Sequence, residues 1–167
     1  MHWSKNLRVL IIDDNPSIHD DFRKILVGTE RDAALESKEA LLFGEPQAEA
    51  KGEQFQLDSA FQGAEAVEMI LQERTEGRPY AMAFVDIRMP PGIDGIETIE
   101  RIWSLDPEIQ FVICSAYSDH SATDILQRLG VSDRLLMLRK PCDSAEILLL
   151  ATALCEKWNL AQTAKTI

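Results

Sequence analysis

Acidic, hydroxyl and amino side chains stand directly after four apolar runs of the sequence. Asp13 and Asp14 follow the first run, and Asp86, Ser115 and Lys140 follow three later ones. Each has an ordinary explanation by itself, because Asp and Ser commonly cap helices and Lys-Pro marks a turn. If the runs are parallel strands, however, all five side chains reach one edge of the sheet. The sequence therefore predicts a crevice that holds three carboxylates, one hydroxyl and one ammonium group.

Clustered carboxylates repel one another and need either a proton or a cation. Two like charges about 4 Å apart at an effective dielectric constant of about 20 repel by about 4 kcal/mol, so the cluster must raise a pKa or bind a cation. Oxygen donors suit Mg²⁺, or Mn²⁺ in its place. Beside such an ion a carboxylate can form an acyl phosphate, while Lys140 neutralises one phosphoryl oxygen and Ser115 donates to another.

The elements that position these residues follow an alternating pattern. Nearly continuous apolar runs are typical of strands covered on both faces, and helical patterns separate them. The alternation predicts an α/β fold with a doubly wound, five-stranded parallel sheet in flavodoxin-like order 2-1-3-4-5. The mixed polar pattern of 55–58 suits an edge strand. The expected strands are 7–12, 55–58, 81–85, 111–114 and 135–138, and helices are expected after Asn15, at 62–75, after Asp94, at 120–129 and after Asp143.

One connection is too long for this pattern. Residues 28–54 separate the first helix from the second strand, where about 2–6 residues are usual. Between residues 30 and 53 stand seven acidic residues against three basic ones, and 33–43 could form a short helix. Two interpretations stay open, a solvated acidic insertion and a docking element for a partner. We expect one domain over 6–158 that includes this insertion, followed by a tail or linker start at 159–167.

Charge and composition limit the classes of partner. The chain has 167 residues, and 17 Lys and Arg against 28 Asp and Glu give a net charge of -11. This charge disfavours direct binding to nucleic acid or to an anionic membrane. The three cysteines of the chain show no metal-ligand spacing and suggest reduced core thiols. The start shows no secretory pattern, and no apolar run approaches the roughly 20 residues of a membrane span, so we expect a cytoplasmic protein.

Four segments are similar to the receiver domains of two-component response regulators, the CheY-like family. The similarity covers about residues 7–157 apart from the insertion, and its motifs are specific in combination. The matching segments are Val9-Leu10-Ile11-Ile12-Asp13-Asp14-Asn15, Val85-Asp86-Ile87-Arg88-Met89-Pro90 with Asp94-Gly95, Ile113-Cys114-Ser115-Ala116, and Arg139-Lys140-Pro141.

The resemblance implies a phosphorylatable switch rather than an enzyme with an external substrate. It implies that Asp86 is the phosphoacceptor, and that Ser115 and Lys140 contact the phosphoryl group. It also implies that Mg²⁺ is held by Asp13, Asp14, Asp86 and the backbone carbonyl of Arg88, and that the Lys140-Pro141 bond is cis. The phosphoryl donor would be a histidine kinase or a histidine phosphotransfer protein, and the output would pass to an effector domain or protein.

The sequence departs from the family pattern at several positions. Met137 stands where the family has its switch aromatic residue, and Cys142 replaces the usual phenylalanine after Lys-Pro. The loop that follows Asp86 is one residue longer than usual. Switch and tuning roles fall on Met137, Ala116 and Tyr117, and we expect the bulky Arg88 and Tyr117 to slow hydrolysis of the phosphoryl group.

Other functions and residues receive weaker support. A phosphorylation-independent binding module stays open because of Met137 and the insertion. A Mg²⁺-dependent aspartyl phosphatase would need a second acid where Arg88 stands. A homodimer could form through the helix at 120–129, the strand at 135–138 and the leucine-rich last helix. We interpret His2, His19 and His120 as surface residues, and Gly92 and Gly95 as turn glycines.

Overall fold

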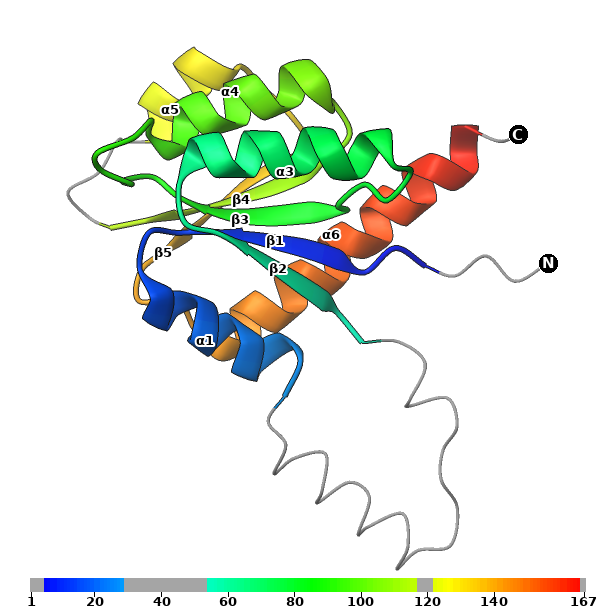
Figure 1. Ribbon diagram of the computed structural model, residues 1–167, viewed down its shortest axis with the longest axis horizontal. Coiled ribbons are helices and arrows are strands. Elements are labelled where there is room, and N and C mark those ends of the chain that lie inside the picture. The colour runs from blue at the N-terminus through cyan, green and yellow to red at the C-terminus, as the bar shows by residue number, and fades with distance from the viewer. Residues whose placement is uncertain (1–4, 29–53, 117–121, 166–167) are drawn as a thin grey trace, which may run out of the picture.

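A central parallel sheet carries the site, as the computed structural model shows for residues 5–28, 54–116 and 122–165 (Figure 1). The strand order is β2-β1-β3-β4-β5, and every neighbouring pair is parallel. This order confirms the α/β doubly wound, flavodoxin-like prediction. The strands are β1 (Arg8–Ile12), β2 (Gln56–Ala60), β3 (Met82–Asp86), β4 (Gln110–Ser115) and β5 (Leu135–Arg139).

Of the five helices in the described residues, four stand between consecutive strands and α6 follows β5, and several begin at the predicted caps. Asn15 accepts a hydrogen bond from the Ser17 amide at 3.1 Å, and Asp94 accepts one from the Glu97 amide at 2.8 Å. These bonds satisfy amides that have no partner inside the helix. The helices are α1 (Pro16–Leu26), α3 (Gly63–Thr75), α4 (Gly95–Leu105), α5 (Ala122–Leu129) and α6 (Ser144–Lys165).

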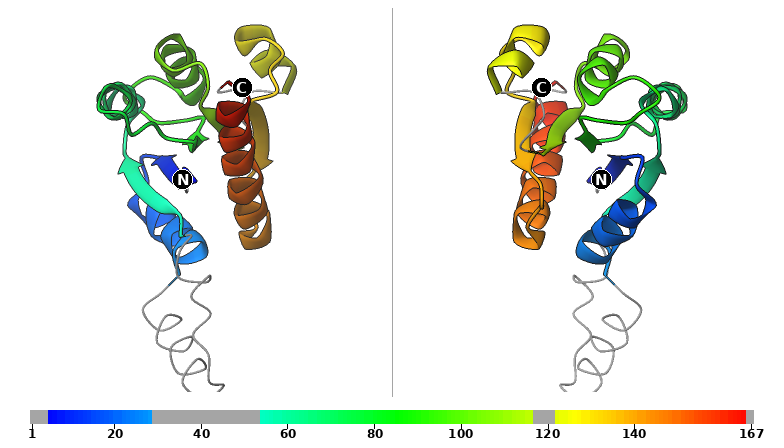
Figure 2. Two further views of the ribbon diagram at one scale, coloured as in Figure 1. Left: turned by 90° about the vertical axis from the view of Figure 1, so that its right-hand side faces the viewer. Right: turned by 90° about the vertical axis from the view of Figure 1, so that its left-hand side faces the viewer.

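The helices cover the two faces of the sheet and create two apolar cores. α3, α4 and α5 lie on one face, and α1 and α6 lie on the other (Figures 1 and 2). β3 and β4 are buried along their whole length, because central strands of a parallel sheet have helices on both sides. In the described part of the chain, no helix combines the length and the hydropathy of a membrane span.

The strand register brings the polar strand ends together. Asp86 stands opposite Cys114, and Ser115 stands opposite Arg139. Ile12, the last residue of β1, stands opposite Val85. Since the strands are parallel and end at nearly the same level, the residues that follow them share one edge of the sheet.

The structure corrects some details of the predicted elements. β2 ends at Ala60 rather than 58, because its half-buried middle residues hide the end of the strand from a hydropathy pattern. Leu148 and Leu149 of α6 are exposed, so these two leucines of the leucine-rich last helix lie outside the core. The helix suggested for 33–43 lies outside the described residues.

Candidate functional site

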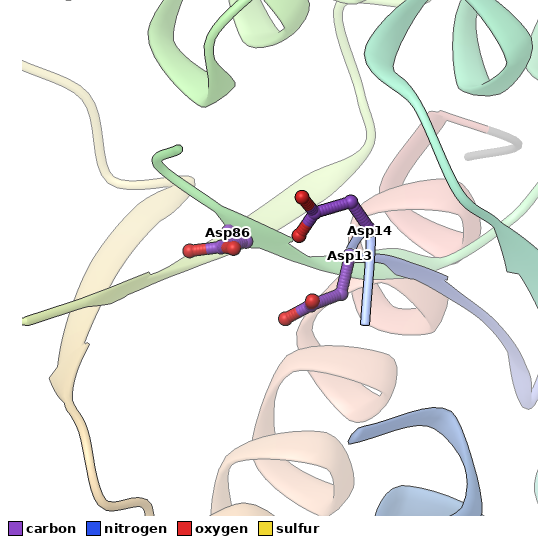
Figure 3. Close-up of side chains that lie close together, drawn as sticks. All are labelled: Asp13, Asp14 and Asp86. Atoms are coloured by element: carbon purple, nitrogen blue, oxygen red, sulfur yellow. The ribbon is translucent and has the colours of Figure 1, made fainter. Parts of the chain in front are cut away.

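Three carboxylates meet where β1 and β3 end. Asp13 and Asp14 directly follow β1, and Asp86 is the last residue of β3. One carboxylate oxygen from each lies within 4.8 Å of one oxygen of the other two, and Figure 3 shows the side chains around one space. Asp13 and Asp86 are buried, whereas Asp14 is exposed. We call these three residues the carboxylate cluster.

Lys140 brings the positive charge of the site. Its Nζ lies 3.2 Å from an oxygen of Asp86 and 3.4 Å from an oxygen of Asp13. The side chain comes from the segment after β5, and the Lys140 amide donates to the Ser115 carbonyl at 2.8 Å. The Lys140-Pro141 peptide bond is cis, as the resemblance implied.

The electrostatic balance of the site favours a bound cation. Burial, together with the negative charge of Asp13, raises the pKa of Asp86, although Lys140 and the Arg88 backbone amide act in the opposite direction. Burial acts to lower the pKa of Lys140, but the carboxylates of Asp13 and Asp86 raise it above its usual value. Lys140 therefore stays charged, and one ammonium group stands against three carboxyl groups.

The residues present fit a divalent metal ion with a preference for oxygen. The donors are carboxylate oxygens, and Mg²⁺ is usually held by one or two carboxylates with water and phosphate oxygens completing an octahedron. Mn²⁺ accepts the same donors. An ion in this space would relieve the repulsion that raises the pKa of Asp86.

His19 is buried next to the carboxylate cluster, so the interpretation of His19 as a surface residue is wrong. It is 6% exposed, and its Nε2 lies 2.7 Å from the backbone carbonyl of Asp13. Its Nδ1 lies 2.8 Å from the Ser59 hydroxyl, and its ring packs against Phe61. Because the carbonyl only accepts, Nε2 donates to it. The signal in the sequence was the spacing of His19 with Phe22 and Leu26, which places all three on the buried face of α1.

Gly95 brings α4 close to the phosphoacceptor candidate. Its amide donates to the Ile87 carbonyl at 2.8 Å, and a Cβ atom here would lie 2.4 Å from the Asp86 carbonyl. Gly95 is the first residue of α4 rather than a simple turn glycine. The glycine is needed because no side chain fits between the end of β3 and the helix.

The other predicted residues lie around the carboxylate cluster with less direct contacts. Ser115 is buried at the end of β4, and its hydroxyl donates to the Ala116 carbonyl at 3.1 Å. The backbone amide of Arg88 donates to the Asp86 carboxylate, while the Arg88 side chain is exposed. Met137 lies on the edge strand β5, 36% exposed and in register with Ile113. Tyr117 lies outside the described residues.

An apolar cavity of about 480 Å³ opens beside the site, between α1 and the start of α6. Phe22, Phe84 and Ile147 contribute to its walls, and Asp86 and Lys140 lie at its polar side. Two cysteines, Cys114 and Cys142, also line it.

Comparison with known sequences identifies the family. Residues 46–152 match the model of the response regulator receiver domain. The chain is 29% identical over 129 residues to the uncharacterized transcriptional regulatory protein YesN of Bacillus subtilis, of whose length it spans only 29%. It is 30% identical over 95 residues to sporulation initiation phosphotransferase F of the same organism. The aligned region covers 57% of this chain and 69% of that protein.

Solved structures share the fold at low sequence identity. A response regulator receiver protein from Sinorhizobium medicae matches with a TM-score of 0.62 at 23% identity, over 92% of this chain and 97% of that one. A CheY-like receiver domain protein from Methanospirillum hungatei matches with a TM-score of 0.60 at 20% identity, over 90% and 94%. A structure described as adenylate cyclase from Rhodopirellula baltica matches with a TM-score of 0.68 at 20% identity, over 96% of each chain. Because the family model matches residues 46–152, a range that contains β2, β3, β4 and β5, this chain belongs to the response regulator receiver domain family.

Proposed function

We propose that residues 6–158 form a receiver whose Asp86 accepts a phosphoryl group from a phosphohistidine. The donor is a histidine kinase or a histidine phosphotransfer protein. The observation that carries this proposal is the position of Asp86, with its carboxylate inside the carboxylate cluster and 3.2 Å from Lys140 Nζ. In this role the chain is a switch that promotes its own phosphorylation and dephosphorylation, and not an enzyme with an external substrate.

The transfer step has Asp86 as its nucleophile and the phosphohistidine of the donor as its phosphoryl source. A carboxylate oxygen of Asp86 attacks phosphorus, the P–N bond to the donor imidazole breaks, and the imidazole leaves with that electron pair and takes up a proton. Asp86 becomes an acyl phosphate. Water later attacks phosphorus, releases inorganic phosphate and restores the carboxylate.

The surrounding residues neutralise and orient the transferring group. Lys140 would exchange its contact with Asp86 for a phosphoryl oxygen, and Ser115 would turn its hydroxyl from the Ala116 carbonyl toward another. Asp13, Asp14, Asp86 and the Arg88 carbonyl would hold Mg²⁺ or Mn²⁺. When bound, the ion supplies positive charge that offsets the charge developing on the phosphoryl oxygens.

Two other functions receive less support from the site. An aspartyl phosphatase would need an acidic residue as general acid two residues after Asp86, and the residue there is Arg88. A phosphorylation-independent binding module would not need three mutually repelling carboxylates, whose retention carries an energetic cost.

Incubation with acetyl phosphate and Mg²⁺ tests the proposal. We expect the wild-type chain to gain the mass of one phosphoryl group, labile to hydroxylamine, and Asp86→Asn to gain none. Asp20→Asn, a change of the same type at an exposed position of α1, is the matched control and should be labelled like the wild type. Absence of label on the folded wild-type chain would overturn the proposal.

We propose in addition that phosphorylation promotes a homodimer through the surface of α5, β5 and α6. Several large apolar side chains are exposed there, namely Leu126, Leu136, Met137, Leu148 and Leu149. Exposed apolar side chains that gather on one surface favour protein contacts. Sedimentation should show a dimer for the phosphorylated wild type and a monomer for Leu149→Glu. A phosphorylated wild type that stays monomeric at high concentration contradicts this part of the proposal.

A further inference from the structure

Two thiols face the cavity beside the site and come from segments far apart in the sequence. Cys114 lies on β4, 4% exposed, and Cys142 is half-buried in the short segment between β5 and α6. Both line the same cavity as Lys140. Cys142 packs against the apolar core cluster that contains Cys114.

The two thiols differ in chemical character. An interaction with the Cys114 thiol lowers the pKa of Cys142, and the nearby Lys140 ammonium acts in the same direction, whereas burial acts against it. The same interaction, together with burial, raises the pKa of Cys114. The thiolate is the reactive form of cysteine. Cys142 is also the more accessible of the two, since Cys114 is buried, so a reagent in the cavity reaches Cys142 first and Cys114 is its partner.

We propose that Cys142 and Cys114 form a peroxide-responsive thiol pair that closes to a reversible disulfide. The Cys142 thiolate attacks a hydroperoxide, the O–O bond breaks, and Cys142 becomes a sulfenic acid while the other oxygen leaves with a proton as water or alcohol. The Cys114 sulfur then attacks the Cys142 sulfur, the S–O bond breaks, and water leaves. Two thiols lose two electrons in total, and the hydroperoxide gains them.

The local structure allows the two sulfur atoms to approach. The Lys140 amide bonded to the Ser115 carbonyl keeps the segment after β5 beside the end of β4. Cys142 lies outside any helix or strand, so its backbone can adjust to the S–S distance of about 2.05 Å. The disulfide would tie the segment that carries Lys140 to β4.

The third cysteine offers an internal control. Cys155 lies on α6, is fully buried and does not line the cavity. Burial raises its pKa to about 12. It should stay a thiol under conditions that oxidise the pair.

The experiment treats the whole purified chain with a small excess of hydrogen peroxide and maps its thiols by mass spectrometry without reduction. We expect a Cys114–Cys142 cross-link that dithiothreitol reverses, in the wild type and in Cys155→Ser. In Cys114→Ala, where no resolving thiol remains, dimedone should trap Cys142 as a sulfenic acid. In Cys142→Ala, Cys114 should stay unmodified. Circular dichroism establishes that each variant is folded.

Clear results overturn the inference. Cys142 oxidised to sulfinic acid in the wild type, a cross-link that involves Cys155, or thiols that all survive peroxide would each do so. These measurements do not involve phosphorylation, so their outcome is independent of the proposed role of Asp86. A wild-type cross-link with no labelling by acetyl phosphate would leave the thiol pair in place and remove the proposed phosphoacceptor function.

Discussion

Two groups of charged residues lie toward opposite ends of the parallel strands. They differ in the ratio of acidic to basic side chains. The carboxylate cluster has one ammonium group for three acids. At the amino ends of β1 and β3, Arg8 contacts Asp58 at 3.2 Å and Glu73 at 3.4 Å, and Arg78 contacts Glu73 at 3.0 Å. Tyr80 donates to Asp58 at 2.6 Å beneath the Arg8 guanidinium. We call these five residues the paired cluster.

The difference separates a structural role from a site that can react. In the paired cluster two acids meet two bases, and burial and the Asp58 carboxylate raise the pKa of Tyr80 so that it stays protonated. All its charges have partners inside the chain. The carboxylate cluster keeps an excess of negative charge and buried oxygens directed at a common space, which a cation can fill. Unbalanced charge, more than the number of charged residues, distinguishes the carboxylate cluster from the paired cluster.

The largest effect should come from removing two carboxylates of the unbalanced edge. Asp13→Asn with Asp14→Asn should weaken Mg²⁺ binding by more than roughly 100-fold, beyond the loss typical for residues that only support metal ligands. Calorimetric titration measures the affinity. Asp58→Asn is the matched control, and it should bind Mg²⁺ like the wild type. Similar losses in both variants would erase the distinction between the two clusters.

A smaller loss of Mg²⁺ affinity is expected from the residue behind the cluster. In His19→Asn the amide can still reach Ser59 but not the Asp13 carbonyl, and Mg²⁺ affinity should fall by about 10–100-fold. His19→Gln places an amide nitrogen near the position of Nε2 and should recover most of that affinity. If both variants lose affinity equally, His19 acts only by filling space.

The paired cluster should respond in stability and not in metal binding. Tyr80→Phe removes the hydrogen bond to Asp58 and should lower the free energy of unfolding by about 1.5 kcal/mol, the low end for bonds to charged groups, because water can reach Asp58. Urea denaturation measures it. Mg²⁺ affinity should stay unchanged, and a drop in that affinity would mean that the two edges are coupled.

The smallest effect is a gain in stability at the carboxylate cluster. Without Mg²⁺, Asp86→Asn should raise the free energy of unfolding by about 1 kcal/mol at pH 7. The pKa of Asp86 is raised in the folded chain. The Asp86 carboxyl group therefore keeps its proton to higher pH in the folded state than in the unfolded state. Wild-type stability therefore falls as pH rises from the ordinary carboxyl pKa through the raised one.

The pH dependence supplies the control for this last prediction. The gain from Asp86→Asn should shrink when the pH falls toward the ordinary carboxyl pKa, where Asp86 is protonated in both states. Denaturation curves across that interval measure it. A gain that does not change with pH would have a cause other than charge.

The sequence predicted the sheet and the carboxylate cluster because both depend on local patterns. Apolar runs mark β1, β3 and β4, and the residues directly after them reach the same edge in any parallel sheet. His19 was missed because its partners, the Asp13 carbonyl and Ser59, come from different strands. The paired cluster was missed for the same reason, since Arg8 and Glu73 meet only through tertiary packing. Partners far apart in the chain leave no local signal.

The missing side chain at Gly95 has a mechanical consequence. The first turn of α4 rests directly on the carbonyl of Asp86, without any flexible group between them to absorb a displacement. The Gly95 amide also fastens that turn to Ile87. A displacement of the end of β3 would therefore also move the first turn of α4, because the two are in contact without an intervening side chain.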